Sequence, residues 1–317
     1  MKKLPILLLF IFSCSILKAQ ESKKESSQSN ADVSLIILGT IQDAGSPHIS
    51  CEKECCMGLH KDPPADRLVV SLGVVDFTND KTYLFEASPD FISQTRILKD
   101  FAAKSSDIPD GIFLTHAHIG HYTGLMYLGK ESINAQGVNV YTMPKMNDFL
   151  ENNGPWEQLV TTENIELTIL HHKKELRLNN NLAVTPYKVP HRDEYSETVG
   201  YLIEGPSKKA LFIPDVDKWK EWDMDIVDMI KQMDYVFIDA TFYDGEEVNN
   251  RDISEIPHPF VIESMQLFKD LSSADKGKVH FIHFNHTNPL INAESKQAKK
   301  VLESGFNIAQ FKDVFTL

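Results

Sequence analysis

Three histidines fall within six residues in the stretch Leu114-Thr115-His116-Ala117-His118-Ile119-Gly120-His121. The apolar run 111–114 before them predicts a short buried strand, and residues 122–128 after them predict the start of a helix. Side chains alternate along a strand end, so His116 and His118 project to the same side, and His121 joins them from the helix entry. Neutral imidazoles are good zinc ligands, and three that converge in one loop favour a metal site over core packing.

Three later apolar runs also end in residues that bind metals. His191 follows Val189-Pro190, Asp215 follows the run 211–214, and His283 lies within the run 281–284. Three protein ligands with an open fourth position are typical of a catalytic zinc rather than a structural one. One such run alone is weak evidence, but their repetition at successive strand ends indicates a metal centre.

The histidine stretch resembles the His-x-His-x-Asp-His motif of the metallo-β-lactamase superfamily, and the later residues follow in the order of that superfamily. The resemblance implies the α+β class and an αββα sandwich, in which two β-sheets are faced by helices. It also implies two metals. The ligands of the first are His116, His118 and His191, and those of the second are Asp215, His121 and His283, with Asp215 bridging both.

One position departs from this motif. Gly120 stands where the superfamily has an aspartate that binds the second metal. The loss of a carboxylate is expected to weaken that site, so the sequence supports the first metal better than the second. Zinc is the expected cofactor, and iron or manganese is the alternative at the catalytic site.

The resemblance implies metal-assisted hydrolysis, in which a metal-bound hydroxide attacks a small ester or a phosphodiester. Asp215 has a catalytic role here as the bridging ligand. His258, ahead of a helix predicted over 259–271, resembles the extra histidine of the phosphodiesterase branch, which includes the tRNase Z group. That resemblance implies a role in protonating the leaving group or stabilising the transition state. The alternative is a histidine that only caps the helix or lies in a loop.

A second cluster consists of Cys51, Cys55 and Cys56. An odd number of thiols fits disulfide pairing poorly, whereas three nearby thiolates suit a structural zinc with a fourth ligand from elsewhere. One local disulfide beside a free thiol is the alternative.

The cysteine cluster resembles the Cys-rich insert of the pyrroloquinoline quinone synthesis protein B family and of the phosphonate-pathway cyclic phosphodiesterase. This resemblance implies that His286, three residues after His283, completes a structural zinc site. The spacing Cys-x3-Cys-Cys departs from the family pattern, and adjacent cysteines point the same way only where the chain bends. His60 is therefore an alternative to Cys55 or Cys56 as a ligand.

The same resemblance extends over most of the chain through residues 191–201, 239–244 and 285–289. It raises two rivals to the hydrolase. One is an oxidoreductase or hydroxylase of the synthesis-protein-B type, with iron at the same histidines. The other is a metal-binding protein with weakened catalysis. Beside His191, Arg192 and Tyr195 are predicted to contact a small-molecule substrate.

The N-terminus predicts export. Residues 1–19 begin with two lysines, Lys2 and Lys3, followed by a short apolar run, which is typical of a signal peptide. Residues 20–32 predict a flexible tether before a domain over 33–317 with a Cys-rich insert at 41–66. Lipid attachment at Cys14 is the alternative to cleavage after Ala19. The protein is therefore expected in the periplasm, or anchored to a membrane that faces it.

Charge excludes one class of partner. Removal of residues 1–19 takes away three lysines and no acidic residue, so the formal net charge falls from −13 to −16. Such a field repels polyanions, and we expect no nucleic-acid partner.

Overall fold

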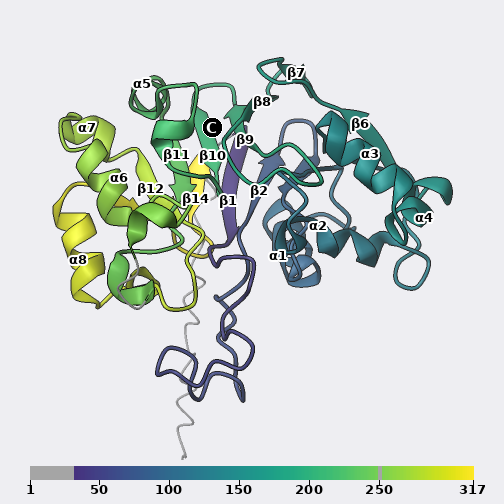
Figure 1. The fold of residues 1–317 in the computed structure, drawn as a ribbon. Helices are drawn as coiled ribbons and strands as arrows, with labels where there is room; N and C mark the ends of the chain where they lie inside the picture. The colour runs from purple at the N-terminus through teal and green to yellow at the C-terminus, as the bar shows by residue number, and fades with distance from the viewer. Residues whose placement is uncertain (1–31, 249–251) are drawn as a thin grey trace, which may run out of the picture. The chain divides into compact units, whose positions relative to one another are not determined.

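Two seven-stranded sheets form the centre of the fold (Figure 1). The computed structural model describes residues 32–248 and 252–317. The predicted signal peptide, the predicted lipid site at Cys14 and all but the last residue of the predicted tether lie outside the described residues. No helix within the two described ranges has both the length and the apolar composition required to cross a membrane.

Each sheet contains both parallel and antiparallel neighbours. The first has the order β14-β1-β2-β3-β4-β5-β6 and the second has the order β13-β12-β11-β10-β9-β8-β7. The strands of the first sheet are β1 (Val33–Gly39), β2 (Ser71–Asp76), β3 (Lys81–Phe85), β4 (Gly111–Phe113), β5 (Val138–Thr142), β6 (Ile165–Ile169) and β14 (Val314–Thr316). Those of the second are β7 (Leu176–Arg177), β8 (Ala183–Lys188), β9 (Val199–Glu204), β10 (Lys209–Ile213), β11 (Tyr235–Asp239), β12 (Val279–Ile282) and β13 (Asn307–Ile308).

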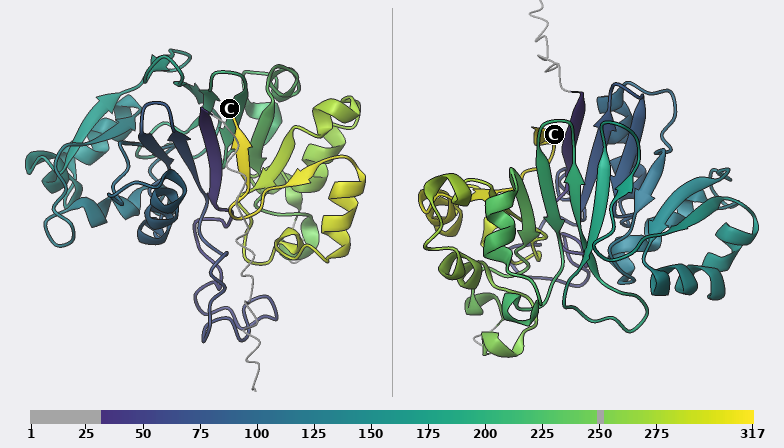
Figure 2. Two further views of the ribbon diagram at one scale, coloured as in Figure 1. Left: turned by 180° about the vertical axis from the view of Figure 1, so that it is seen from behind. Right: turned by 90° about the horizontal axis from the view of Figure 1, so that it is seen from above.

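Helices cover the outer faces of both sheets. The view from above shows those of the first and second halves on opposite sides of the paired sheets (Figure 2), which confirms the predicted αββα sandwich. The α-helices are α1 (Phe91–Ala102), α2 (Ile119–Tyr122), α3 (Pro144–Asn152), α4 (Trp156–Thr161), α5 (Ile226–Gln232), α6 (Val261–Leu267), α7 (Ser273–Lys276) and α8 (Lys296–Glu303). The 3-10 helices are η1 (Thr123–Leu128), η2 (Trp219–Glu221), η3 (Gly245–Val248), η4 (Ile253–Glu255) and η5 (Pro289–Ile291).

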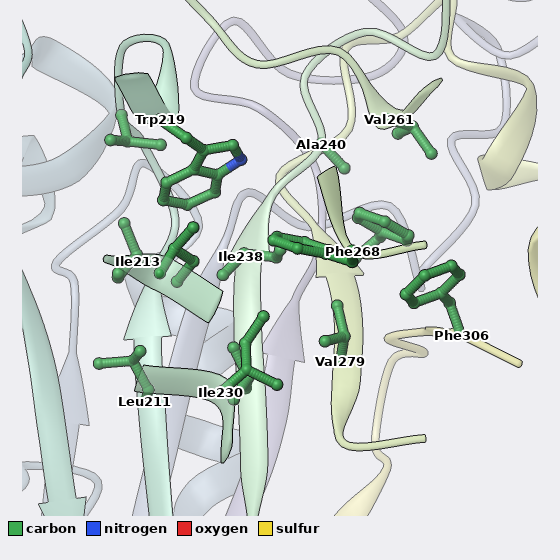
Figure 3. Close-up of a cluster of buried hydrophobic side chains, with 14 of the residues drawn as sticks. Leu211, Ile213, Trp219, Ile230, Ile238, Ala240, Val261, Phe268, Val279 and Phe306 are labelled. Carbon is green, nitrogen blue, oxygen red and sulfur yellow. The ribbon is translucent and has the colours of Figure 1, made fainter. Parts of the chain in front are cut away.

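Central strands are buried on both faces, which explains their continuous apolar runs. In β10, Leu211 and Ile213 face the helices together with Ile238 (Figure 3), whereas Phe212 faces the other sheet. Phe212 packs there in a core with Phe113 of β4. Full burial of a side chain of this size contributes about 1.5–3 kcal/mol, so this inter-sheet layer is a main source of stability.

The parallel strands bring their carboxyl ends together. Strands β3 to β6 run parallel to one another, and so do β10 to β13. In open α/β sheets, ligands bind beyond the carboxyl ends of such strands. The histidine stretch follows β4, Asp215 follows β10 and His283 follows β12, so the fold alone places these residues at one edge.

The segment after β1 connects the two sheets at this edge. Ile41 forms parallel bridges with both Val69 and Phe284. The Gln42 N–H donates to the Phe284 carbonyl (2.8 Å), and the Phe284 N–H donates to the Thr40 carbonyl (2.8 Å). The Cys-rich insert then follows as turns and loop that project below the sheets in Figure 1.

Two helices differ from their predicted bounds. The helix predicted over 122–128 begins at Ile119 as α2 and continues as the 3-10 helix η1. The helix predicted over 259–271 is limited to α6. Phe260 has an extended backbone before its start, and the backbone of Phe268 (φ −90°, ψ 5°) is no longer α-helical after its end.

Candidate metal centre

The first predicted metal group comes together around Asp215. Its Oδ2 lies 3.4 Å from His116 Nε2, 3.2 Å from His191 Nε2 and 3.8 Å from His118 Nδ1. The four donor atoms lie within 4.8 Å of one another, although they come from three separate loops. This is the arrangement that the sequence predicts for the first metal.

The donor atoms of this group lack other partners. His116 Nε2 and Asp215 Oδ1 are buried and make no hydrogen bond. An unpartnered buried polar atom costs about 1–3 kcal/mol of stability, and several of them at one point therefore indicate a binding site for an ion. Imidazole nitrogens with one carboxylate form a donor set that suits zinc, iron or manganese, and the group therefore fits a divalent cation.

A second group lies beside the first. Asp43, His121 and His283 also bring their donor atoms within 4.8 Å of one another, and Asp215 Oδ2 is 3.9 Å from His121 Nε2. The Nε2 atoms of both histidines are buried without a hydrogen-bond partner. The sequence predicts these two histidines and Asp215, but it does not predict Asp43. The available signal was a carboxylate shortly after the first strand.

Two ligand histidines of the first group, His116 and His191, are oriented through their other ring nitrogen. His116 Nδ1 lies 2.8 Å from Thr115 Oγ1, and the His191 Nδ1–H donates to Asp217 Oδ1 at 2.8 Å. Such outer contacts fix the ring and the tautomer of a metal-binding imidazole. Burial disfavours the charged form of His191, but the carboxylates of Asp215 and Asp217 raise its pKa to about 10.

The ligand histidines of the second group have similar support. His283 Nδ1 lies 3.0 Å from Thr241 Oγ1. His121 Nδ1 lies 3.6 Å from Glu86, a fully buried carboxylate directly after β3 that makes no hydrogen bond. Burial opposes protonation of His121, yet Glu86 raises its pKa. The sequence analysis missed these supporting residues, although a carboxylate at the end of a buried strand is a readable signal.

His258 lies beside Asp215 at the more exposed side of the site. Its Nδ1–H donates to Asp239 Oδ2 at 2.8 Å and lies 3.3 Å from Asp215 Oδ1. Burial lowers the pKa of His258, but Asp239 and Asp215 outweigh that effect and raise it to about 9. The side chains of His258 and His118 are both 17% exposed, whereas His116 is 1% exposed. The site is therefore more accessible on the side of His258 and His118 than on the side of His116.

The two predicted substrate contacts lie on an exposed loop after His191. Arg192 is exposed, and Tyr195 is exposed with its ring 5.8 Å from that of Phe149. The Ala117 N–H donates to Ser196 Oγ at 2.7 Å, which ties this loop to the histidine stretch. The loop is thus placed beside the open side, and the roles of Arg192 and Tyr195 stay predictions.

The cysteine cluster forms as predicted. The donor atoms of Cys51, Cys55, Cys56 and His286 lie within 4.8 Å of one another, and the three cysteines are free thiols. His60 is not part of the group, because its Nε2 faces the Cys51 carbonyl at 3.4 Å. The structure thus brings together the four predicted ligands and leaves the alternative ligand, His60, outside them.

A cavity of about 620 Å³ lies against this cluster and includes Glu247 in its lining. The Glu247 carboxylate accepts hydrogen bonds from Tyr243 N–H (2.5 Å) and Thr287 Oγ1 (2.8 Å). Burial is the main cause that raises the pKa of Glu247 to about 7. The native state therefore holds this proton more tightly than the unfolded chain.

This proton predicts a pH-dependent stability. A raised carboxyl pKa stabilises the fold fully below about pH 4.3, and that stability is lost as the pH rises through about 7. Glu247→Gln is expected to increase the free energy of unfolding by about 2 kcal/mol at pH 8 and to change little at pH 4. Urea denaturation at both pH values measures this difference. Glu246→Gln, at an exposed neighbour, is the control, and an equal gain at both pH values would contradict the prediction.

Comparisons with known proteins agree with this geometry. Residues 81–284 match the family described as "Beta-lactamase superfamily domain". The chain is similar to coenzyme PQQ synthesis protein B of Methylobacillus flagellatus, with 25% identity over 304 residues that cover 86% of this chain and 96% of the relative. Zinc-bound PqqB from Methylobacterium extorquens has a TM-score of 0.72 at 19% identity, covering 90% of this chain and 100% of that one. A diphosphatase from the PhnP family has a TM-score of 0.60 at 20% identity, covering 89% of this chain and 96% of that one.

The family match covers more than half of the chain, and the two structural neighbours share its fold over nearly their full lengths. The histidine and aspartate cluster lies at the carboxyl ends of the strands in both sheets. On these findings, the chain belongs to the metallo-β-lactamase superfamily.

Proposed function

We propose that this protein is a zinc-dependent hydrolase that acts on a small ester or phosphodiester. The observation that carries the proposal is the set of buried imidazole nitrogens around Asp215 that have no hydrogen-bond partner. Such a set is costly for stability alone, and it lies at the strand edge where this kind of fold binds ligands.

In this proposal, one set of residues holds the cations and another set orients the ligand rings. His116, His118 and His191 hold one cation, and His121 and His283 hold a second, with Asp215 between them. When bound, such a cation acts as a Lewis acid and lowers the pKa of a coordinated water. Asp217, Thr115, Thr241 and Glu86 keep the rings oriented.

His258 is the proton donor in this proposal. With a pKa of about 9 it is protonated at neutral pH, and its Nδ1–H is held by Asp239. The proton on its Nε2 is not engaged by Asp239, and it would donate to the oxygen of the leaving group. Asp239 is suited to hold it, because the imidazoles of His258 and His283 outweigh burial and lower the pKa of Asp239 to about 2.

A phosphodiester is the first substrate class to test. The fold is shared with a protein described as a diphosphatase and, at a TM-score of 0.54 and 14% identity, with human tRNase Z. The net charge of −13 argues against a polynucleotide, so we propose a small molecule instead. We also propose export to the periplasm, with or without a lipid at Cys14, on the composition of residues 1–19.

The test is turnover of bis(4-nitrophenyl) phosphate and of 4-nitrophenyl acetate by the protein loaded with zinc, manganese or iron. We expect hydrolysis of at least one of them with zinc. The proposal fails if no ester is hydrolysed with any of the metals.

Replacing His258 with asparagine tests its role separately. We expect kcat to fall by about 100-fold for an ester with a poor leaving group such as phenol, and by less for 4-nitrophenol, which needs no proton. Steady-state kinetics on the two esters measure this difference. His171→Asn, at an exposed histidine, is the control. An equal loss on both esters would assign His258 a structural role.

One observation favours a second function, that of an iron-dependent oxidoreductase or hydroxylase. The likeness to coenzyme PQQ synthesis protein B covers 86% of the chain, and histidines with a carboxylate also bind iron with open positions. This alternative predicts oxygen consumption by the iron-loaded protein and no ester hydrolysis. Tight metal binding without either activity would instead indicate a metal-binding protein.

A further inference from the structure

The space beside Gly120 is already filled by another residue. A Cβ atom at position 120 would overlap Asp43 Cβ and would lie 2.6 Å from Asp43 Cα, which is closer than real Cβ contacts come. The backbone of Gly120 is helical in α2, so conformation does not demand glycine there. The glycine is required because the Asp43 side chain and backbone occupy the adjoining volume.

Backbone pairing delivers Asp43 to this place. The preceding residue, Gln42, donates its N–H to the carbonyl of Phe284 at 2.8 Å, and Phe284 directly follows His283. The Gly45 N–H then donates to the Gln42 carbonyl (2.9 Å), which turns the chain around Asp43. The Gln42 side-chain amide contacts the Asp43 carboxylate. The carboxylate is therefore held next to His283 by the segment after β1, which connects the two sheets.

The donor set at this point is incomplete without Asp43. His121 Nε2 and His283 Nε2 are buried and have no hydrogen-bond partner. Each of these histidines brings a ring nitrogen within 4.8 Å of an Asp43 oxygen. Two imidazoles and one terminal carboxylate, with Asp215 Oδ2 3.9 Å from His121 Nε2, make a set typical of zinc, manganese or iron.

We propose that Asp43, from the start of the Cys-rich insert, is the terminal carboxylate ligand of the second cation and replaces the aspartate that is missing at position 120. The ligand keeps its chemistry and its place in the fold, but it is supplied by a different segment of the chain. The inference deepens the proposed function and rests on it only for the presence of a cation, so its test measures binding rather than turnover.

The first test is the isosteric change Asp43→Asn, measured by competition for Zn²⁺ and Mn²⁺ with a chromophoric chelator. We expect affinity at one of the sites to fall by about 100-fold or more, since even loss of a ligand's outer partner costs 10–100-fold. The affinities of the other sites are expected to stay unchanged. Asp62→Asn removes an exposed carboxylate from the same insert and is the control. Wild-type affinity in Asp43→Asn would overturn the proposal.

A ligand exchange provides the sharper test. Gly120→Asp alone is expected to lower thermal stability and not to tighten metal binding, because its Cβ overlaps Asp43. Asp43→Gly alone is expected to lose the second cation. The double variant Asp43→Gly with Gly120→Asp removes the overlap with the Asp43 Cβ and restores a carboxylate, while the 2.6 Å approach to the Cα of residue 43 has to be relieved by a small backbone shift. It is expected to recover affinity to within about 10-fold of the wild type.

Two results would overturn the inference from this series. One is tighter binding in Gly120→Asp alone, and the other is a double variant that binds no better than Asp43→Gly. Asp43→Asn keeps the test decisive if the double variant does not fold, because it changes neither volume nor backbone. A protein that binds the second cation through Asp43 but hydrolyses no ester would refute the proposed function and leave this inference standing.

Discussion

Replacement of His116 by alanine is expected to abolish ester hydrolysis, with kcat/KM reduced by about 1,000-fold or more. This residue has the least replaceable position in the first group. It is fully buried, its Nε2 lies 3.4 Å from Asp215, and its ring packs against that of His121 with centroids 4.2 Å apart. Loss of the imidazole removes one of three nitrogen donors, and alanine offers no substitute.

The measurement is kcat/KM together with the metal content of the purified variant. We expect one cation per chain to be lost along with activity, while circular dichroism shows the fold retained. His171→Ala, at an exposed histidine, is the matched control and is expected to retain wild-type turnover. Activity retained by His116→Ala would remove the histidine stretch from the mechanism.

The second large effect is expected at Cys56. Among the three thiols it is the fully buried one, and its Sγ accepts a hydrogen bond from the His48 N–H at 3.3 Å. If the cluster holds a cation, folding and metal binding are coupled, and such coupling contributes about 10 kcal/mol or more in small zinc domains. Cys56→Ser is therefore expected to lower the free energy of unfolding by at least about 3 kcal/mol.

Urea denaturation in the presence and absence of a chelator measures this loss. The wild type should become less stable with chelator, whereas Cys56→Ser should be insensitive to it. Ile49→Ser changes an insert side chain that is 79% exposed, and it controls for general effects on the loop. An unchanged urea midpoint in Cys56→Ser would mean that the cluster holds no structural metal.

The sequence was sufficient for ligands that belong to a local pattern. His116, His118 and His121 share one loop, and their spacing alone places them together. Asp43 could not be found in this way, because its place depends on the pairing of Gln42 with Phe284 across the two sheets. No spacing within the sequence records that contact.

The cysteines show a related limit. Adjacent Cys55 and Cys56 were difficult to place in one site, because neighbouring side chains normally diverge. The structure resolves this with a turn in which the Cys56 N–H donates to the Lys53 carbonyl at 2.9 Å. A bend of this kind depends on the whole insert, so its geometry is not readable from the spacing of the thiols.

The residues that orient the histidines were also missed. Asp217 and Thr241 carry no motif of their own, and Glu86 is separated from His121 in the sequence by a helix and a strand. Their role follows only from the distances to the imidazole nitrogens. Supporting residues of this type can be identified only from their position in the folded chain, whereas the ligands can be identified from their residue type and spacing.

The distribution of donors between the two sheets has a mechanical consequence. His116 and His121 follow a strand of the first sheet, whereas Asp215 and His283 follow strands of the second. A bound cation would therefore act as a non-covalent cross-link between the two halves of the chain. Separation of the halves would require loss of the cation, and the cross-link closes long loops between ligands that are far apart in the sequence. Removal of the cation should then accelerate amide hydrogen exchange in the layer between the sheets, well away from the reacting atoms.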